Sequence, residues 1–136
     1  MARSFLDTNI LLYSDDSFDA RKNQIAVDLL ADLRITKAGV ISTQVLQEYF
    51  ANAVGKLNLD VMLARRRVEL FAKFDVVIPS LELILAAIDL QRLNSLSFWD
   101  AMIVQAARVS GCEILLSEDM QHGQTIAGLR IVNPFA

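Results

Sequence analysis

The chain has 136 residues, 54% of them hydrophobic, with a formal net charge of −3 and one cysteine, Cys112. This length supplies one domain with a buried core, so we expect a single domain over residues 1–136. The lone cysteine excludes a disulfide framework and a Cys-rich zinc site within one chain, and the negative charge is atypical of proteins that bind nucleic acid by bulk electrostatics.

Short apolar runs alternate with longer helical patterns along the chain. In the first half of the chain, the patterns predict a strand at 4–6, a helix from about 19 to 33, a strand at 39–41 and a helix from a cap at Ser42 or Thr43 to about 54. A helix from about 59 to 74, a strand at 76–78 and a helix from about 81 to 93 follow. The last predicted elements are a helix that Ser97 opens and that reaches about 109, a strand at 113–116 and a strand at 130–132.

This alternation predicts an α/β fold with a central parallel sheet flanked by helices on both faces, in three layers. In such sheets, ligands bind beyond the carboxyl ends of the strands. Two acidic residues stand just after predicted strands: Asp7 follows the first, and Asp119 follows the strand at 113–116. Glu48 lies in the helix after the second strand and Asp100 in the first turn of another helix, so all four can converge at one end of the sheet.

Each acid also has a purely structural explanation. Asp7 and Asp119 can be turn residues, and Asp100 stands three residues after Ser97, which is the spacing of a helix capping box. Glu48 is harder to explain in this way, because its helix is largely apolar. Considered separately, each acid therefore favours a structural role over a catalytic one, and Glu48 has the weakest structural explanation.

Considered together, four carboxylates at one end of a sheet repel one another and raise each other's pKa. A bound cation relieves that repulsion. Oxygen ligands without His or Cys favour the hard ions Mg²⁺ and Mn²⁺. Such ions commonly join carboxylates to phosphate oxygens, so the pattern predicts metal-assisted hydrolysis of a phosphodiester.

At this point the sequence resembles a known family. The segments that carry the resemblance are 5–11 (FLDTNIL), 42–48 (STQVLQE), 96–101 (LSFWDA) and 115–123 (LLSEDMQHG). In this order and spacing they resemble the PIN-domain family and, more narrowly, the VapC-type toxins of bacterial toxin–antitoxin pairs. The resemblance extends over essentially the whole chain.

The resemblance implies a Rossmann-like α/β/α sandwich and a Mg²⁺- or Mn²⁺-dependent endoribonuclease. It also implies a cognate antitoxin protein as partner and a homodimer. The acidic quartet that would hold the metal and act in catalysis is Asp7, Glu48, Asp100 and Asp119. A housekeeping PIN nuclease and a non-catalytic module that binds RNA or protein stay open as alternatives.

Neighbouring polar residues would support the quartet. Thr8, Asn9 and Ser117 match the polar positions of the family's motifs. Glu118 is adjacent to Asp119, and neighbours in an extended segment point to opposite sides, so only one of the two is expected to face the metal directly. The motif match assigns that position to Asp119, and Glu118 could then contact the metal only through a water molecule.

Several other side chains favour structural roles. His122, the only histidine, is expected to be a polar loop residue, and Phe98 and Trp99 are expected in the core, with base stacking by the aromatic residues as the alternative. The basic run Arg65-Arg66-Arg67 is expected to form a solvated helix face, with phosphate contact as the alternative.

Two other acid-rich α/β classes fit less well. A phosphatase of the haloacid-dehalogenase type needs a second Asp two residues after Asp7, where this chain has Asn9. A phosphoacceptor receiver domain needs a late lysine, and no lysine follows Lys73. The chain begins without the pattern of a signal peptide and has no apolar run of the ~18 residues that suggest a membrane span, so we expect a cytoplasmic protein without a membrane segment.

Overall fold

The computed structural model describes residues 2–136 and contains a six-stranded sheet in the order β3-β2-β1-β4-β6-β5. Every pairing is parallel except that of β5 with β6, which is antiparallel. The strands are β1 (Ser4–Leu6), β2 (Gly39–Ser42), β3 (Asp75–Val77), β4 (Ile114–Leu116), β5 (Thr125–Ile126) and β6 (Leu129–Val132).

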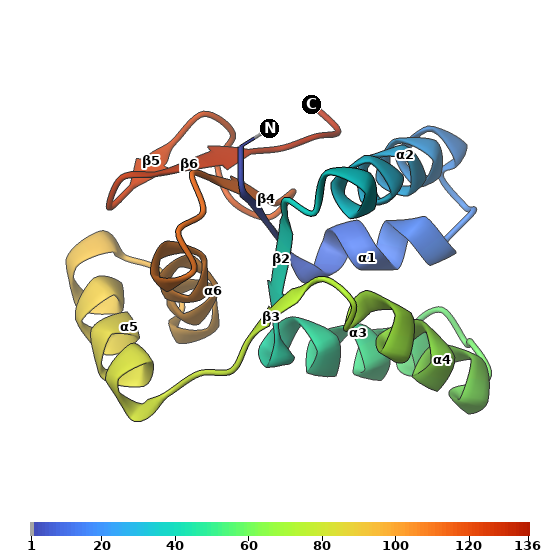
Figure 1. Ribbon diagram of the computed structural model, residues 1–136, viewed down its shortest axis with the longest axis horizontal. Helices are drawn as coiled ribbons and strands as arrows, with labels where there is room; N and C mark the ends of the chain where they lie inside the picture. The colour runs from blue at the N-terminus through green and yellow to red at the C-terminus, as the bar shows by residue number, and fades with distance from the viewer. Residues whose placement is uncertain (1) are drawn as a thin grey trace.

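Helices cover both faces of this sheet (Figure 1). The helices are α1 (Thr8–Asp15), α2 (Ala20–Thr36), α3 (Thr43–Gly55), α4 (Val61–Phe71), α5 (Leu81–Asn94) and α6 (Phe98–Val109). Figure 1 shows α5 and α6 on one side of the sheet and α1 to α4 on the other. The α/β fold with three layers predicted from the sequence is therefore confirmed.

The central strands are short and largely buried, as expected when helices cover both faces of a sheet. All residues of β1 and β2 are buried. Phe5 and Ile41 from these strands, Ile103 from α6 and Tyr49 from α3 belong to one core and are at most 2% exposed. The strands are only three or four residues long in this region, so the loops at the two ends of each strand are only a short distance apart.

A small acceptor side chain precedes each helix. Asp7, Asp19 and Asp60 cap α1, α2 and α4, and in each case the carboxylate accepts a hydrogen bond from a backbone N–H of the first turn. Serines cap α3, α5 and α6 in the same way. These caps satisfy backbone donors that have no partner within a helix, so they fix the residue at which each helix begins.

Two elements differ from the prediction. Helix α1 begins directly after β1, where no helix was predicted, and its Ile10 and Leu11 are completely buried where α1 packs against α2 and α3. Strand β5 was also missed; its antiparallel pairing makes the sheet mostly parallel instead of wholly parallel. The other predicted elements are present, with boundaries displaced by a few residues.

None of the helices in residues 2–136 combines the length and the apolar character that a membrane crossing requires.

Candidate active site

The predicted acidic residues lie around the carboxyl ends of β1, β2 and β4. Strands β1 and β4 are neighbours, with Leu6 opposite Leu116, so the residues that follow them, Asp7 and Ser117, are brought together. The strand pairing continues one step further, because the Asp7 N–H donates to the Leu116 carbonyl at 3.0 Å. Sheet register therefore places the Asp7 and Ser117 side chains beside each other.

Asp7 is the most deeply buried of the four acids, at 5% exposure. Its Oδ1 accepts from the Thr8 backbone N–H and its Oδ2 accepts from the Ser117 hydroxyl, both at 2.7 Å. Burial, and to a smaller extent the negative charges of Asp119 and Glu48, raise the pKa of the Asp7 carboxyl to about 6, although the two hydrogen bonds lower it. The ionised form is thus held in an environment that disfavours it.

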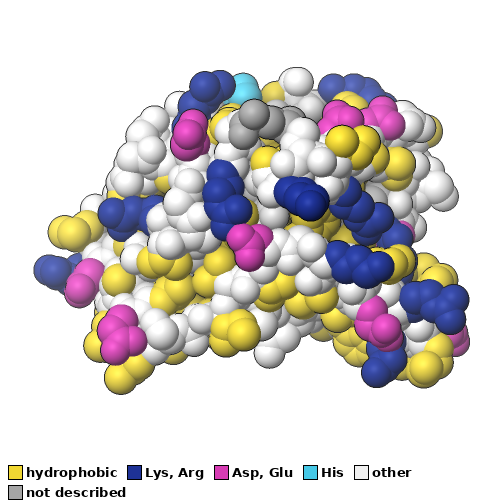
Figure 2. All heavy atoms as spheres, viewed as in Figure 1, with side chains coloured by type: hydrophobic (Ala, Val, Ile, Leu, Met, Phe, Trp, Pro, Cys, Tyr) yellow, Lys and Arg dark blue, Asp and Glu magenta, His cyan; other side chains and the backbone are white. Residues whose placement is uncertain are grey.

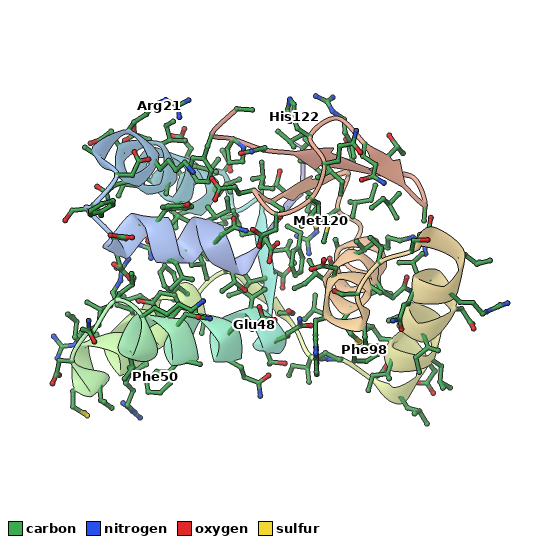
Figure 3. The ribbon with its side chains drawn as sticks, turned by 180° about the vertical axis from the view of Figure 1, so that it is seen from behind. Arg21, Glu48, Phe50, Phe98, Met120 and His122 are labelled. Atoms are coloured by element: carbon green, nitrogen blue, oxygen red, sulfur yellow. The ribbon has the colours of Figure 1, made fainter. Side chains whose placement is uncertain are left out.

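Glu48 is fixed from two sides. The Thr8 hydroxyl donates to its Oε2 at 3.1 Å, and the Gln44 amide donates to its Oε1 at 2.6 Å. The same Gln44 amide nitrogen also donates to the Trp99 carbonyl at 3.2 Å, which ties α3 to the first turn of α6. Figure 3, a view from the reverse side of Figure 1, labels Glu48 on α3 near the middle of the molecule.

Asp119 is exposed and lies in the segment after β4. The Asn9 amide donates to its Oδ2 at 3.0 Å, while the Asn9 carbonyl oxygen accepts from the Glu118 N–H at 3.3 Å. The Ser117 hydroxyl accepts from the Asp119 N–H at 3.2 Å in addition to donating to Asp7. Asn9 and Ser117 therefore link the segment after β1 to the segment after β4.

Asp100 stands in the first turn of α6, where the Ser97 side chain accepts from its backbone N–H at 3.1 Å. The capping interaction anticipated from the Ser97 spacing is thus present. Burial raises the pKa of the Asp100 carboxyl, hydrogen bonding to Ser97 lowers it, and the charge of Asp119 raises it. The Asp119 charge thus acts on the pKa of both Asp100 and Asp7.

The donor set suits a hard divalent cation. Within residues 2–136, none of the four carboxylates forms an ion pair with a lysine or arginine. In the same residues, however, no three Asp, Glu, His or Cys side chains are already arranged around one cation position. The residues present fit Mg²⁺ or Mn²⁺ by chemistry, and binding would require the carboxylates to move closer together.

The Glu118 carboxylate has polar partners outside the four acids. It accepts from the Tyr13 hydroxyl at 2.7 Å and forms an ion pair with Lys22. Burial and the hydrogen bond to Glu118 raise the pKa of Tyr13. The polar contacts of the Glu118 carboxylate thus lie with α1 and α2.

Two residues with a part in this geometry were missed or misjudged from the sequence. Gln44 was not singled out, although it stands four residues before Glu48 and hence on the same face of α3. Trp99 was expected in the core and is 62% exposed; it lines a cavity of about 390 Å³ together with Glu48. A second cavity of about 260 Å³ borders Asp119 and is lined in part by Tyr13.

The basic run and the histidine have structural partners. Arg65 pairs with Glu69 across one turn of α4, whereas Arg67 pairs with Asp15 and is only 24% exposed, so the expectation of a uniformly solvated face is wrong for Arg67. The His122 Nδ1 accepts from the Asn133 N–H at 2.9 Å, in agreement with a loop role.

Comparisons with known proteins agree with this arrangement. The family model of the PIN domain matches residues 4–125. None of the curated protein sequences compared matches the chain.

Three solved structures share the fold. The crystal structure of VapC20 from Mycobacterium tuberculosis, a toxin that cleaves the sarcin-ricin loop, superposes with a TM-score of 0.70 at 21% identity, over 85% of this chain and 89% of that one. A toxin–antitoxin complex from Klebsiella pneumoniae gives a TM-score of 0.67 at 21% identity, over 96% and 97%. VapBC2 from Rickettsia felis, bound to a DNA fragment of its promoter, gives a TM-score of 0.65 at 15% identity, over 94% of this chain and 96% of that one.

Proposed function

Since the chain belongs to the PIN-domain family, we propose that it is a metal-dependent endoribonuclease and the toxin of a type II toxin–antitoxin system. One observation carries the proposal: carboxylates from four separate segments lie around one end of the sheet with no lysine or arginine paired to them in residues 2–136. A protein that leaves such charges uncompensated is suited to hold a divalent cation.

The four acids have unequal tasks in this proposal. Asp7, buried and held by Ser117 and Thr8, is the fixed ligand around which the others gather. Asp119 is exposed, and within residues 2–136 its carboxylate accepts a hydrogen bond only from Asn9, so that carboxylate is free to approach the ion together with Asp100. When bound, Mg²⁺ or Mn²⁺ would neutralise the acids, polarise a phosphate oxygen and lower the pKa of a water molecule.

Glu48, like Asp7, has both carboxylate oxygens restrained, in its case by Thr8 and Gln44. Those hydrogen bonds hold the Glu48 carboxylate in one orientation beside Thr8. Because the nucleophile in this mechanism is water and not the ribose 2′-hydroxyl, cleavage leaves a 5′-phosphate and a 3′-hydroxyl. A 2′,3′-cyclic phosphate would contradict the mechanism.

The proposed partners are RNA as substrate and an antitoxin protein as inhibitor. One structural neighbour is described as a toxin–antitoxin complex, another is VapBC2 bound to a fragment of its promoter, and a third is a toxin that cleaves the sarcin-ricin loop, which supports this choice. We also propose a homodimer, from the family resemblance. Copurification with the product of an adjacent small open reading frame, and the mass of the purified protein in solution, test these two points.

The decisive experiment is cleavage of RNA by the purified chain, with Mg²⁺, with Mn²⁺ and with EDTA. We expect cleavage that requires the metal and is lost in Asp7→Asn, with 5′-phosphate ends found by sequencing. Asp32→Asn is the matched control, since it makes the same chemical change at an exposed position of α2. Cleavage that persists in EDTA, or that Asp7→Asn retains, would contradict the proposal. So would RNA binding without cleavage, which would indicate a binding module.

A further inference from the structure

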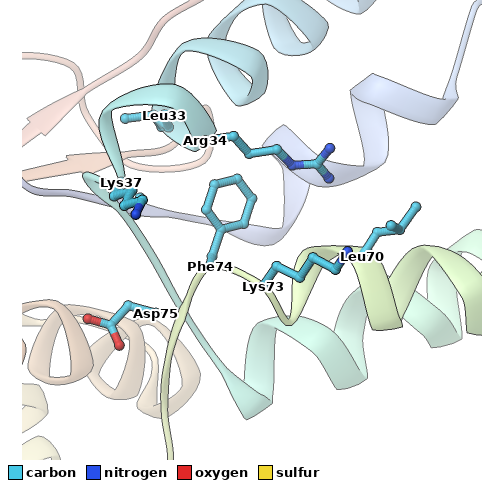
Figure 4. Close-up of a pocket in the computed structure, with 8 residues that line it drawn as sticks. Leu33, Arg34, Lys37, Leu70, Lys73, Phe74 and Asp75 are labelled. Atoms are coloured by element: carbon cyan, nitrogen blue, oxygen red, sulfur yellow. The ribbon is translucent and has the colours of Figure 1, made fainter.

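A further cavity, distinct from the two beside the acids, lies at the opposite end of the sheet. It has a volume of about 740 Å³, and its lining includes Gly39 and Asp75, the first residues of β2 and β3 (Figure 4). Parallel strands start here and end beside the carboxylates, so the body of the sheet separates this cavity from the candidate active site. Any ligand of the cavity therefore occupies a site of its own.

Three cationic side chains surround the cavity. Arg34 comes from the last turn of α2, Lys37 from the end of that helix, and Lys73 from the turn after α4. All three are exposed, and within residues 2–136 none forms an ion pair. The one acid that lines the cavity, Asp75, is paired with Arg3.

This local excess of positive charge contrasts with the net charge of −3 for the whole chain. Figure 2 shows lysine and arginine side chains gathered on the corresponding face of the molecule. Cations near the C-terminal ends of helices also interact favourably with the helix dipole, which accounts for each of them singly. The dipole does not account for the convergence of cations from two helix ends on one cavity.

The floor of the cavity is apolar. Leu33 is completely buried, Phe74 is 8% exposed and Leu70 is half-buried. The Phe74 ring reaches this position because residue 39 is glycine: a Cβ there would lie 2.7 Å from the ring's Cδ1. The Arg34 guanidinium lies 5.8 Å from the centre of the same ring. The cavity thus combines an apolar floor with a cationic rim.

We propose that this cavity binds the phosphate of a nucleotide, with Arg34, Lys37 and Lys73 at the phosphate and the sugar or base against Leu33 and Phe74. A volume of about 740 Å³ is within the ordinary range for sites of small organic ligands. The nucleotide is either free or part of an RNA chain, since the recognised chemistry is the same. The site does not depend on nuclease activity, because it shares no residue with the four acids.

Binding is tested on the full chain in EDTA, so that RNA is not cleaved. The probes are AMP and a 12-residue oligoadenylate, with affinity measured by calorimetry or fluorescence anisotropy. We expect Lys37→Glu and Lys73→Glu to weaken binding of at least one probe tenfold or more, and to make the salt dependence of oligonucleotide binding shallower. Arg66→Glu is the matched control, an exposed position of α4 outside the cavity, and we expect it to change affinity less than twofold.

The two probes separate the two sources of the phosphate. Loss of AMP binding alone indicates a free nucleotide, and loss of oligonucleotide binding alone indicates an RNA chain; each supports the site. Chemical shifts of the Gly39 and Lys37 amides in the unmodified protein provide a measurement that needs no variant. The proposal is overturned if neither probe binds, if Arg66→Glu weakens binding as much as the cavity variants, or if those amides do not respond.

Discussion

Replacement of Asp7 by asparagine is expected to stabilise the metal-free protein at neutral pH while removing its response to a divalent cation. The carboxyl is 5% exposed, and burial raises its pKa to about 6 from the ordinary value of 3.8. The folded protein therefore binds this proton more tightly than the unfolded chain does. A neutral amide of nearly the same shape avoids the cost of ionising a buried carboxyl and can still accept from the Thr8 N–H.

The size of the effect follows from the difference between the two pKa values. At about 1.4 kcal/mol for each pKa unit, ionised Asp7 lowers the free energy of unfolding by about 3 kcal/mol. This cost is absent below pH 3.8, grows as the pH rises from about 4 to about 6, and is fully present above pH 6. The free energy of unfolding of Asp7→Asn should thus equal that of the unmodified protein near pH 4 and exceed it by up to about 3 kcal/mol at pH 7.

The assay is urea unfolding in EDTA at several pH values between 4 and 8, repeated with Mg²⁺. With an m-value of about 1–3 kcal/mol/M, a change of about 3 kcal/mol moves the urea midpoint by roughly 1 M or more. Mg²⁺ should raise the midpoint of the unmodified protein and leave that of Asp7→Asn nearly unchanged. Asp32→Asn, at an exposed site, controls for the removal of one negative charge.

The reasoning fails if Asp7→Asn is less stable than the unmodified protein at pH 7 in EDTA. It also fails if the stability difference between the two proteins does not change between pH 4 and pH 7. Either result would mean that the Asp7 carboxyl does not experience the burial on which the argument depends.

Three further changes test separate parts of the structure. Gly39→Ala places a Cβ 2.7 Å from the buried Phe74 ring, so we expect a loss of about 1–3 kcal/mol in urea unfolding; an unchanged midpoint would mean that the ring moves aside freely. Ser97→Ala removes the N-cap of α6 and should lower the free energy of unfolding by about 1 kcal/mol in the same assay, whereas Ser97→Thr should retain most of the stability that the cap provides. Gln44→Ala releases Glu48, and we expect the Mg²⁺ concentration for half-maximal RNA cleavage to rise about 10–100-fold; an unchanged metal requirement would remove Gln44 from a positioning role.

Gln44 also shows how the two halves of the candidate site are joined. Its amide bonds both Glu48 on α3 and the Trp99 carbonyl on α6, helices on opposite faces of the sheet. Trp99 itself projects outward beside Glu48 and lines the cavity next to it. A change in the position of α6 would therefore be transmitted to Glu48 as well as to Asp100.

Helix α1 illustrates a limit of prediction from sequence. It has eight residues, too few for a stable helix in isolation, and begins with Thr8 and Asn9, which are not strong helix formers. Its stability comes from Ile10 and Leu11, which are buried between α1 and its neighbouring helices. No local pattern marks that burial. Strand β5, two residues long, likewise exists only because β6 pairs with it.

The sequence alone determined the alternation of strands and helices and the identity of the acids that follow the strands. These features depend on hydrophobic period, on capping residues and on the order of the motifs, which are all local properties of the chain. The parallel sheet and the gathering of Asp7 and Ser117 at one edge follow from them, because the carboxyl ends of parallel strands meet there.

Only the tertiary structure decided how side chains distant in sequence face one another. It placed Trp99 outward, turned Glu118 toward Tyr13 and Lys22, and brought cations from α2 and from the turn after α4 around one cavity. The physical reason is that such contacts depend on the packing of helices against the sheet and against each other. That packing minimises the free energy of the whole core, and short-range sequence patterns do not specify it.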